Sequence, residues 1–308
     1  MEKIQGISKF KSKLPTAITI GTFDGVHVGH RQILQRLINN AKEANYNSVL
    51  LTFFPHPRMV LQKESNIKLL NTLEEKIKIL ESLGLDYVIV HPFTKEFSRL
   101  SAIEFVRDIL VNQLSVKKVV IGYDHRFGRN RNANINDLIA FGNTLDFEVE
   151  EISAQEVDEV SVSSTKIRTA LEEGNITTAN SYLGYPFMLT GSVVRGKGLG
   201  RQIAFPTANL KIAESYKLIP KSGVYVAKSI IDGNTIYGMM NIGFNPTVAG
   251  KEKSIEVHFF DFNQDLYEKK LKVELLHHLR DEHKFDSVED LKTQLLKDKQ
   301  TSLVLITK

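Results

Sequence analysis

Apolar residues in the first part of the chain fall into short continuous runs that alternate with segments of helical spacing. The runs at residues 17–23, 48–54, 87–90 and 117–122 are rich in apolar residues and predict strands. Strands that are apolar on consecutive positions and separated by helices are typical of a parallel sheet covered on both faces. The pattern therefore predicts a doubly wound, Rossmann-like α/β domain.

The helical segments between these runs carry their own start signals. Thr72 and Glu75 have the spacing of a capping box, and Ser101 and Glu104 repeat it before a helix that ends near Leu114. Each box predicts a helix that begins at the residue after its hydroxyl. The apolar positions expected to face the sheet are Ile33, Leu34, Leu37, Ile38 and Ala41 in the first helix and Leu73, Ile77, Leu80 and Leu83 in the second.

The pattern changes after a short helix that is predicted to begin near Ser164. Glycine and proline at positions 184 and 186 follow a stretch without a strong strand or a long helix. A length of 308 residues suggests about two domains. We therefore predict a first domain over residues 1–183 and a second over residues 184–308.

Short strand-like runs at close spacing dominate the second domain. Asp232 and Gly233 supply a hairpin turn, and Ser287 with Asp290 predicts the start of one final helix. Closely spaced antiparallel strands followed by a single helix indicate a small β-barrel with a C-terminal helix. The predicted strands are residues 188–194, 224–231, 235–241, 254–262 and 270–276, and the helix presents Val288, Leu291 and Leu295.

Composition narrows the class of protein. The chain has no cysteine, which excludes a disulfide scaffold, a thiolate nucleophile and a cysteine-ligated zinc or iron–sulfur site. No run approaches the ~20 apolar residues of a membrane helix, and the N-terminus lacks a signal-peptide core, so we expect a cytoplasmic protein without a membrane partner. A formal charge of +4 is too weak to argue for a nucleic-acid partner. A small anionic ligand agrees with it equally well.

The densest chemical signal is residues 21–30 (GTFDGVHVGH), where the first strand ends and the first helix begins. Gly25 and Gly29 let the backbone approach a phosphate, and the helix N-terminus offers unpaired N–H groups. His27 and His30 are three residues apart, so on a helical turn they point to the same side and can donate to a polyphosphate. A metal pair or two purely structural histidines are the alternatives.

A second segment favours the phosphate interpretation. Residues 163–168 (SSTKIR) open a helix at the end of the first domain with hydroxyls, helix N–H groups and two cations. Together they suit the other side of a triphosphate. Taken alone, the segment is better explained as an ordinary helix cap.

These two motifs resemble those of the nucleotidyltransferase superfamily. With residues 52–57 (TFFPHP) and 122–128 (GYDHRFG) they resemble, more closely, the adenylyltransferase module of prokaryotic bifunctional riboflavin kinase/FAD synthetases. His125 departs from that pattern, because the family usually has an aromatic residue there. The resemblance implies that ATP is bound by Gly21, Phe23, Gly25, Gly29, His27, His30, Ser164, Thr165 and Arg168, and that the flavin side holds Asp124, Phe127, Gly128 and, with weaker support, His56. Asp24 is a further site residue with weaker support, and His56, between two prolines, is equally well explained as a turn residue.

The second domain contains a glycine loop followed by a polar extended segment. Residues 191–200 (GSVVRGKGLG) lack the spacing and the following helix of a dinucleotide fingerprint, but Gly196, Lys197 and Gly198 suit a nucleotide phosphate. A flexible hairpin is the alternative. Thr207 and Asn209 are two residues apart, so on an extended chain they face one side and suit Mg²⁺ bridging phosphates.

A strand glutamate completes the second motif set. Glu256 lies between apolar Ile255 and Val257, so it points to the opposite face of its strand, where a solvent-facing side chain is the alternative. With residues 205–209 (FPTAN), 223–227 (GVYVA) and 241–247 (NIGFNPT), this strand resembles the riboflavin kinase module. The resemblance implies that Glu256 is the catalytic base and that Thr207 and Asn209 hold Mg²⁺ and ATP.

The expected protein is a two-step flavin cofactor synthase. The second domain would phosphorylate riboflavin with ATP to FMN, and the first would adenylylate FMN to FAD and release pyrophosphate, with Mg²⁺ in each step. One alternative is a nucleotidyltransferase for another phosphorylated substrate, fused to a β-barrel that only binds. A tRNA-binding protein is a second alternative, which the weak and unclustered charge disfavours. Assembly into a homo-oligomer is a further possibility that the sequence leaves open.

Overall fold

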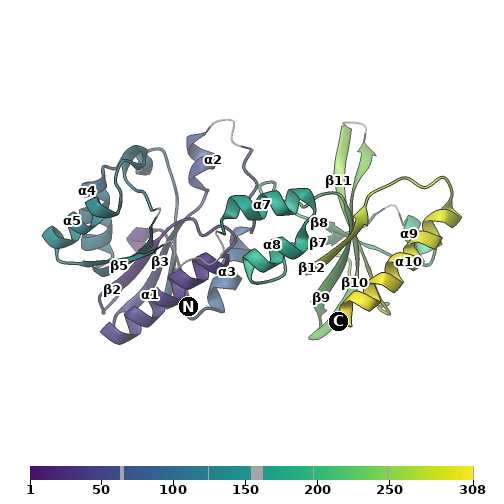
Figure 1. Cartoon of the computed structure of the whole chain (residues 1–308), viewed down its shortest axis with the longest axis horizontal. Coiled ribbons are helices and arrows are strands. Elements are labelled where there is room, and N and C mark those ends of the chain that lie inside the picture. Colours follow the sequence, from purple (N-terminus) through teal and green to yellow (C-terminus); the bar gives the residue numbers. More distant parts are fainter. Residues whose placement is uncertain (63–65, 124, 154–161, 197, 248–249, 308) are drawn as a thin grey trace. The chain divides into compact units, whose positions relative to one another are not determined.

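The computed structural model describes the chain except residues 63–65, 124, 154–161, 197, 248–249 and 308, and it gives backbone alone at 199, 202, 245–247 and 250–252. The described residues form two compact units, Met1–Ser163 and Ser164–Lys308 (Figure 1). Each unit is described by itself. The predicted domain boundary near residue 184 lies at another position in the chain and stays a prediction.

The first unit is built on a six-stranded sheet whose strands all pair in parallel, as the buried runs predicted. Its order is β1-β4-β3-β2-β5-β6, so the chain proceeds in one direction from β2 and returns to β5 on the other side. Open α/β sheets bind ligands beside the carboxyl ends of the strands at such a reversal. The strands are β1 (Glu2–Gln5), β2 (Thr16–Ile20), β3 (Asn47–Phe53), β4 (Tyr87–His91), β5 (Val116–Gly122) and β6 (Glu148–Ile152).

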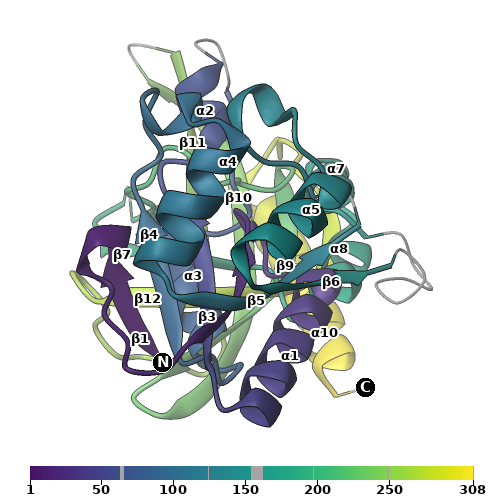
Figure 2. The ribbon, with the colours of Figure 1, turned by 90° about the vertical axis from the view of Figure 1, so that its left-hand side faces the viewer.

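Helices follow the strands, and both predicted capping boxes are present. Thr72 and Ser101 each accept a hydrogen bond from the backbone three residues on, and Glu75 and Glu104 return it. Figure 2 shows α4 and α5 in front of the sheet. The helical elements are η1 (Ile7–Lys9), α1 (Val28–Ala44), α2 (Pro57–Leu61), α3 (Leu73–Glu81), η2 (Phe97–Arg99), α4 (Ala102–Glu104), the π-helix η3 (Phe105–Gln113) that continues it, η4 (Arg129–Arg131) and α5 (Ile135–Leu145).

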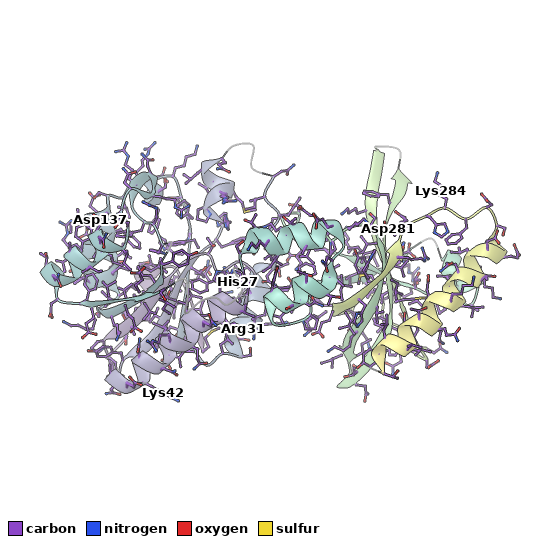
Figure 3. The ribbon with its side chains drawn as sticks, in the orientation of Figure 1. His27, Arg31, Lys42, Asp137, Asp281 and Lys284 are labelled. Atoms are coloured by element: carbon purple, nitrogen blue, oxygen red, sulfur yellow. The ribbon has the colours of Figure 1, made fainter. Side chains whose placement is uncertain are left out.

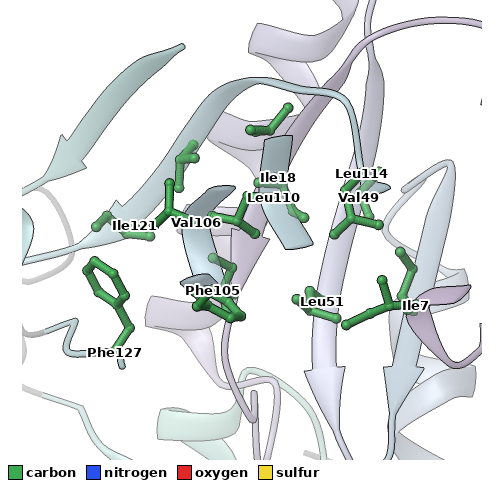
Figure 4. Close-up of a cluster of buried hydrophobic side chains, with 14 of the residues drawn as sticks. Ile7, Ile18, Val49, Leu51, Phe105, Val106, Leu110, Leu114, Ile121 and Phe127 are labelled. Atoms are coloured by element: carbon green, nitrogen blue, oxygen red, sulfur yellow. The ribbon is translucent and has the colours of Figure 1, made fainter. Parts of the chain in front are cut away.

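A large hydrophobic cluster fills the space between the sheet and one layer of helices. Phe105, Val106 and Leu110 of η3 pack there against strand residues such as Ile18 and Leu51 (Figure 4). Helix α1 packs against β2, β3 and β5, and its predicted apolar positions Leu34, Leu37 and Ala41 are buried. Burial of both faces explains why the central strands have continuous apolar runs.

The two strands that the pattern did not predict are the edges of the sheet. β1 (EKIQ) and β6 (EVEEI) are rich in charged residues; β1 is largely exposed and β6 is partly exposed. An edge strand has only one neighbour, and charged side chains protect its free side from pairing with another chain. Edge strands therefore lack the apolar run by which the central strands were recognised.

The second unit contains a closed antiparallel barrel of strand order β10-β11-β8-β7-β12-β9, which confirms the predicted barrel. The hairpin turn at Asp232 and Gly233 is also confirmed, since both residues have positive φ and Ile231 pairs with Asn234. The strands are β7 (Met188–Val194), β8 (Ala208–Lys211), β9 (Gly223–Ile231), β10 (Asn234–Thr247), β11 (Gly250–Phe259) and β12 (Lys270–Asp281).

The described residues of the second unit also form the helices α7 (Ser164–Glu173), α8 (Ile176–Leu183), α9 (Leu199–Gln202) and α10 (Val288–Ile306). The final helix begins as predicted, because the Ser287 hydroxyl accepts from the backbone N–H of Asp290 at 3.0 Å. An ion pair between Arg280 of β12 and the buried Asp298 of α10, at 2.8 Å, fixes this helix to the outside of the barrel. No helix in the described part of the chain has the length and apolar character to span a bilayer.

Candidate active sites

The turn between β2 and α1 lies at the carboxyl edge of the sheet, beside the reversal of strand order. Three of its residues, Phe23, Gly25 and Val26, have φ angles of 47°, 87° and 38° in the left-handed region. For non-glycine residues such a conformation costs of order 1–3 kcal/mol and persists only where its surroundings hold it. The Phe23 and Val26 side chains are buried, and Arg31 Nε donates to the Val26 carbonyl at 3.2 Å. The turn is therefore a strained segment held from several sides.

His27 and His30 lie at the start of α1, with Lys42 at its far end (Figure 3). Their rings stack at 3.6 Å between centroids, so the predicted common orientation is confirmed. His27 is the N-cap, and its Nδ1 accepts the His30 N–H at 3.3 Å. With Nδ1 as the acceptor, a neutral His27 ring carries its proton on Nε2.

The His30 ring is neutral and has a nitrogen that a ligand can contact. Burial, with smaller contributions from His27 and Lys76, lowers the pKa of His30 well below its usual value, so the ring is neutral near pH 7. Its Nδ1 is buried, and among the described residues it has no hydrogen-bond partner. Buried polar atoms are normally paired, so this nitrogen marks a place for a polar group from outside the chain.

A pocket opens beside this turn, and it contains a residue that the sequence pattern did not single out. Lys76 of α3 is only 7% exposed, and its Nζ donates to the Thr22 carbonyl and to the Thr52 hydroxyl, both at 3.0 Å. A signal was available, because Lys76 is three residues after Leu73 and four before Leu80 on the apolar face. The pocket is lined by Thr22, Asp24, Phe53, Phe54, His56, Leu69, Asn71, Leu73 and Lys76.

The residues predicted for the flavin side occupy different environments. His56 lines the pocket and caps α2, where its Nδ1 accepts the Arg58 N–H at 3.1 Å. Phe127 is buried in the hydrophobic cluster beside Phe105, and Gly128 has a φ of 73° and follows it. Asp124 lies outside the described residues. The flavin-side roles of these residues stay predictions.

The second phosphate motif is on α7, which begins at Ser164 as predicted. Ser164 and Arg168 are half-buried, Thr165 is exposed, and Ile167 is buried between them. Because α7 is part of the second compact unit, its approach to His27 and His30 stays a prediction.

In the second unit, the structure brings the predicted kinase residues together on the outer face of the barrel. Ile255 and Val257 are buried, and Glu256 points to the opposite face, as its place in the strand predicted. Glu256 is directly opposite Asn209 of β8, and the Thr207 hydroxyl donates to Glu256 Oε2 at 3.0 Å. A hydroxyl, an amide and a carboxylate from distant parts of the chain thus form one polar cluster.

The glycine loop reaches the same cluster. A Cβ atom at Gly196 would overlap the side-chain amide of Asn209, which would have to move, so the glycine allows this close approach. Gly198, with a φ of 73°, caps the short helix α9. Lys197 lies outside the described residues. The predicted phosphate loop and the predicted metal and ATP residues are therefore neighbours.

His258 is a second residue that the sequence pattern did not identify. It lies two positions after Glu256 on the same face of β11, and its Nδ1 is 2.9 Å from the Pro206 carbonyl. Burial lowers the pKa of His258, so a neutral ring donates to that carbonyl. His258 therefore anchors the turn before Thr207 to the strand that carries Glu256. Its position two residues from a candidate base was the only signal in the sequence.

Comparison with known proteins matches the two parts of the chain to two families. The FAD synthetase family matches residues 9–166, and the riboflavin kinase family matches residues 183–305. The chain belongs to the bifunctional riboflavin kinase/FMN adenylyltransferase family. Members from Buchnera aphidicola subsp. Schizaphis graminum and Escherichia coli K12 are 38% and 36% identical to it; the alignments cover 97% and 98% of this chain and 96% and 97% of theirs.

A solved structure has the same fold along the whole chain. It is named as a macrolide-efflux protein from Streptococcus pneumoniae, is 31% identical, and superimposes with a TM-score of 0.89 over 97% of this chain and 98% of its own. Efflux is said of that protein only, since both families and the curated relatives name flavin transferases. The enzyme phosphorylates riboflavin to FMN and adenylylates FMN to FAD, with ATP as the second substrate of each reaction. The alternative of a barrel that only binds is not favoured.

Proposed function

We propose that the β2–α1 turn is the adenylyl-transfer site and that the Thr207–Glu256 cluster is the kinase site. The observation that carries the proposal is that polar side chains come together at each site. The stacked His27 and His30 lie at a helix N-terminus on the ligand-binding edge of the sheet, and the hydroxyl of Thr207, just before β8, donates to Glu256 of β11. In the first site two histidines of one helical turn face the same side, and in the second site residues distant in the sequence bring their polar atoms together.

In adenylyl transfer, an oxygen of the FMN phosphate attacks the α-phosphorus of ATP. A new P–O bond forms while the bond from the α-phosphorus to the bridging oxygen breaks, and pyrophosphate departs with the electron pair. The nucleophile is already anionic, so no base is required, and catalysis consists of alignment and charge stabilisation. The His27 Nε2–H and the N-terminal N–H groups of α1 donate to the phosphate oxygens. Gly21, Phe23, Gly25 and Gly29 shape this cradle. Ser164, Thr165 and Arg168 are proposed as further ATP-binding residues.

In riboflavin phosphorylation, the nucleophile is a neutral ribityl hydroxyl. Its oxygen attacks the γ-phosphorus of ATP, ADP leaves, and the hydroxyl proton must be accepted. Glu256 is suited to this role, because Thr207 occupies Oε2 and no other hydrogen bond to its carboxylate occurs in the described part of the chain. Oε1 therefore orients the hydroxyl and takes its proton.

The proposal includes Mg²⁺ in both steps. In the kinase site Thr207 and Asn209 supply neutral oxygen donors beside a carboxylate, and Mg²⁺ typically combines one or two protein oxygens with water and substrate phosphates. These residues would hold the ion against the phosphates, where it neutralises charge. Gly196, Lys197 and Gly198 bind the nucleotide next to it.

The remaining assignments are also part of the proposal. The flavin of the first site is held by Asp124, Phe127, Gly128 and His56, of which His56 lines the described pocket. The residues proposed for the two reactions fall within residues 1–183 and 184–308, respectively. Both reactions consume ATP, and neither needs a membrane or a nucleic acid. We therefore place the enzyme in the cytoplasm and propose that its ligands are small molecules.

Paired substitutions test the assignment of the two sites. The double variant His27→Ala/His30→Ala should stop FAD formation while FMN accumulates, because the phosphate donors are lost. Glu256→Gln should abolish FMN formation from riboflavin but leave the conversion of added FMN to FAD. Chromatography of flavins formed from riboflavin, ATP and Mg²⁺ measures both.

The exposed Glu268→Gln in the same unit is the matched control and should behave as wild type. Normal FAD output from the double histidine variant would refute the first site. Loss of both activities in Glu256→Gln would show that this carboxylate maintains the structure instead of accepting a proton.

A further inference from the structure

One buried cation is not accounted for by the phosphate-binding residues. Lys76 lies on the apolar face of α3, and its ammonium bonds the Thr22 carbonyl and the Thr52 hydroxyl, both at 3.0 Å. The Thr52 hydroxyl itself donates to the same carbonyl at 3.2 Å. Thr22 belongs to the turn that leads to His27, and Thr52 is near the carboxyl end of β3. One side chain thus joins α3, β3 and the catalytic turn.

Stability of the fold does not explain this charge. Burying an ammonium is costly, and burial lowers the pKa of Lys76 to about 8, with the buried Asp24 opposing part of that shift. An apolar residue would suit the inner face of α3 better, and replacing buried charges by apolar residues often leaves stability unchanged or raises it. A buried cation kept at a ligand-binding edge therefore indicates a role in the site.

The surroundings of the ammonium connect it to the proposed phosphate site. Asp24 accepts the Leu70 N–H with both carboxylate oxygens, at 2.9 and 3.2 Å, and lines the same pocket as Lys76. The charge of Lys76 also contributes to the lowered pKa of His30. The ammonium therefore acts on both the backbone and the electrostatics of the turn.

The turn needs such support because its backbone is strained. Thr22 directly precedes Phe23, the first of its residues with positive φ, and His27 follows Val26, another of them. Without the ammonium, the Thr22 carbonyl would keep only the Thr52 hydroxyl as a side-chain donor in the described part of the chain. The strained conformation would relax more easily and carry the histidines with it.

We propose that Lys76 is a positioning residue for adenylyl transfer, which holds the 21–27 turn through the Thr22 carbonyl so that His27 and His30 meet the ATP phosphates. The inference rests on the proposed role of that turn. It concerns a residue that acts through the backbone of others, so it predicts a loss of turnover more than a loss of substrate binding.

The test compares Lys76→Met with Lys76→Arg in the full-length enzyme. A misplacement of about 1 Å costs about 100-fold in rate, so Lys76→Met should lower kcat for FAD formation by about that factor. The KM values for FMN and ATP should change by less than about threefold, because the ground-state contacts remain. Lys76→Arg should recover about tenfold of the lost rate, since it keeps a charged donor.

Three controls isolate the effect. Riboflavin phosphorylation by the same preparations should be unchanged, because that site belongs to the second unit. Lys78→Met, on the exposed face of the same helix, should behave as wild type. Thr52→Val removes one of the two acceptors of the ammonium without removing the charge, and should lower the same kcat by about tenfold. This variant decides the question if Lys76→Met does not fold.

Several results would overturn the inference. A wild-type kcat for FAD formation in folded Lys76→Met would overturn it. If Lys76→Met does not fold, a wild-type kcat in Thr52→Val would overturn it. So would a raised KM at unchanged kcat, which would mean that Lys76 only binds substrate. Equal losses in the Met and Arg variants together with equal drops in melting temperature would make the residue structural. The His27→Ala/His30→Ala variant, assayed in parallel, distinguishes the two proposals. If this variant still forms FAD, the proposed site itself is refuted. If it forms no FAD while Lys76→Met is fully active, only the role of Lys76 is refuted.

Discussion

At the scale of single residues, the proposed phosphate site contains a histidine, His30, that is kept neutral by burial. His27 uses Nδ1 as an acceptor within the helix cap, and burial keeps His30 uncharged. A neutral imidazole donates one hydrogen bond in a defined direction, whereas an imidazolium would bind free phosphate and the departing pyrophosphate with little discrimination. The motif therefore favours alignment of the triphosphate over simple charge attraction.

The buried state of His30 predicts a specific pH dependence of stability. Its pKa in the folded protein is below the ordinary value of about 6.5, so the unfolded chain binds more protons in acid. The stability linked to this group is fully present above about pH 6.5 and is lost as the pH falls towards the folded pKa. His30→Gln should therefore lose less stability than wild type between about pH 7 and about pH 5. Calorimetric unfolding across this range measures it, with the exposed His283→Gln as control. Identical pH profiles for wild type and His30→Gln would contradict the prediction.

At the scale of elements, the start of α3 determines where the buried Lys76 lies. The Thr72 hydroxyl accepts the Glu75 N–H at 3.1 Å, and Glu75 Oε2 accepts the Thr72 N–H at 2.8 Å. Lys76 follows this box directly. The same device opens α4 at Ser101 and Glu104, but that helix carries no proposed site residue. Two identical signals thus have different consequences.

This difference gives a matched pair of variants. Thr72→Ala and Ser101→Ala each remove an N-cap hydroxyl, and each should lower the free energy of unfolding by about 1 kcal/mol. Thr72→Ala should in addition reduce FAD formation severalfold below the melting temperature, because it loosens the first turn of α3. Ser101→Ala should leave that rate unchanged. Thermal melts and flavin assays on both variants check this. Equal rates of FAD formation in the two variants would show that the start of α3 does not affect the 21–27 turn.

At the scale of the whole molecule, the division into catalytic units depends on α7 and α8. Asn180 of α8 accepts the Phe187 N–H at 2.7 Å and donates to the Leu275 carbonyl of β12 at 2.8 Å. Ala179 and Leu183 are completely buried. Helix α8 therefore contributes to the packing of the barrel, although the predicted boundary near residue 184 assigns it to the first domain.

Two fragments test this division. Residues 164–308 should fold and phosphorylate riboflavin with the kcat of the full chain. Residues 184–308 lack the buried side chains of α8 and should lose about 3 kcal/mol of stability or more, the usual cost of emptying a core position. Thermal melting and FMN formation compare them, with the full chain as the reference. Equal melting temperatures would support the boundary at 184.

The sequence by itself determined the two fold classes, both helix boxes, the barrel hairpin and the residue types of both sites, because periodicity, capping and turn chemistry are local. A family resemblance was needed to connect those residue types to flavin chemistry. Only the tertiary structure decided which polar groups share a site. The spacing places Lys76 on the apolar face of its helix, but only the packed structure shows that its ammonium bonds Thr22 and Thr52. Thr207 likewise meets Glu256 only when the barrel closes. Such contacts join distant segments, and their geometry depends on packing that no local pattern encodes.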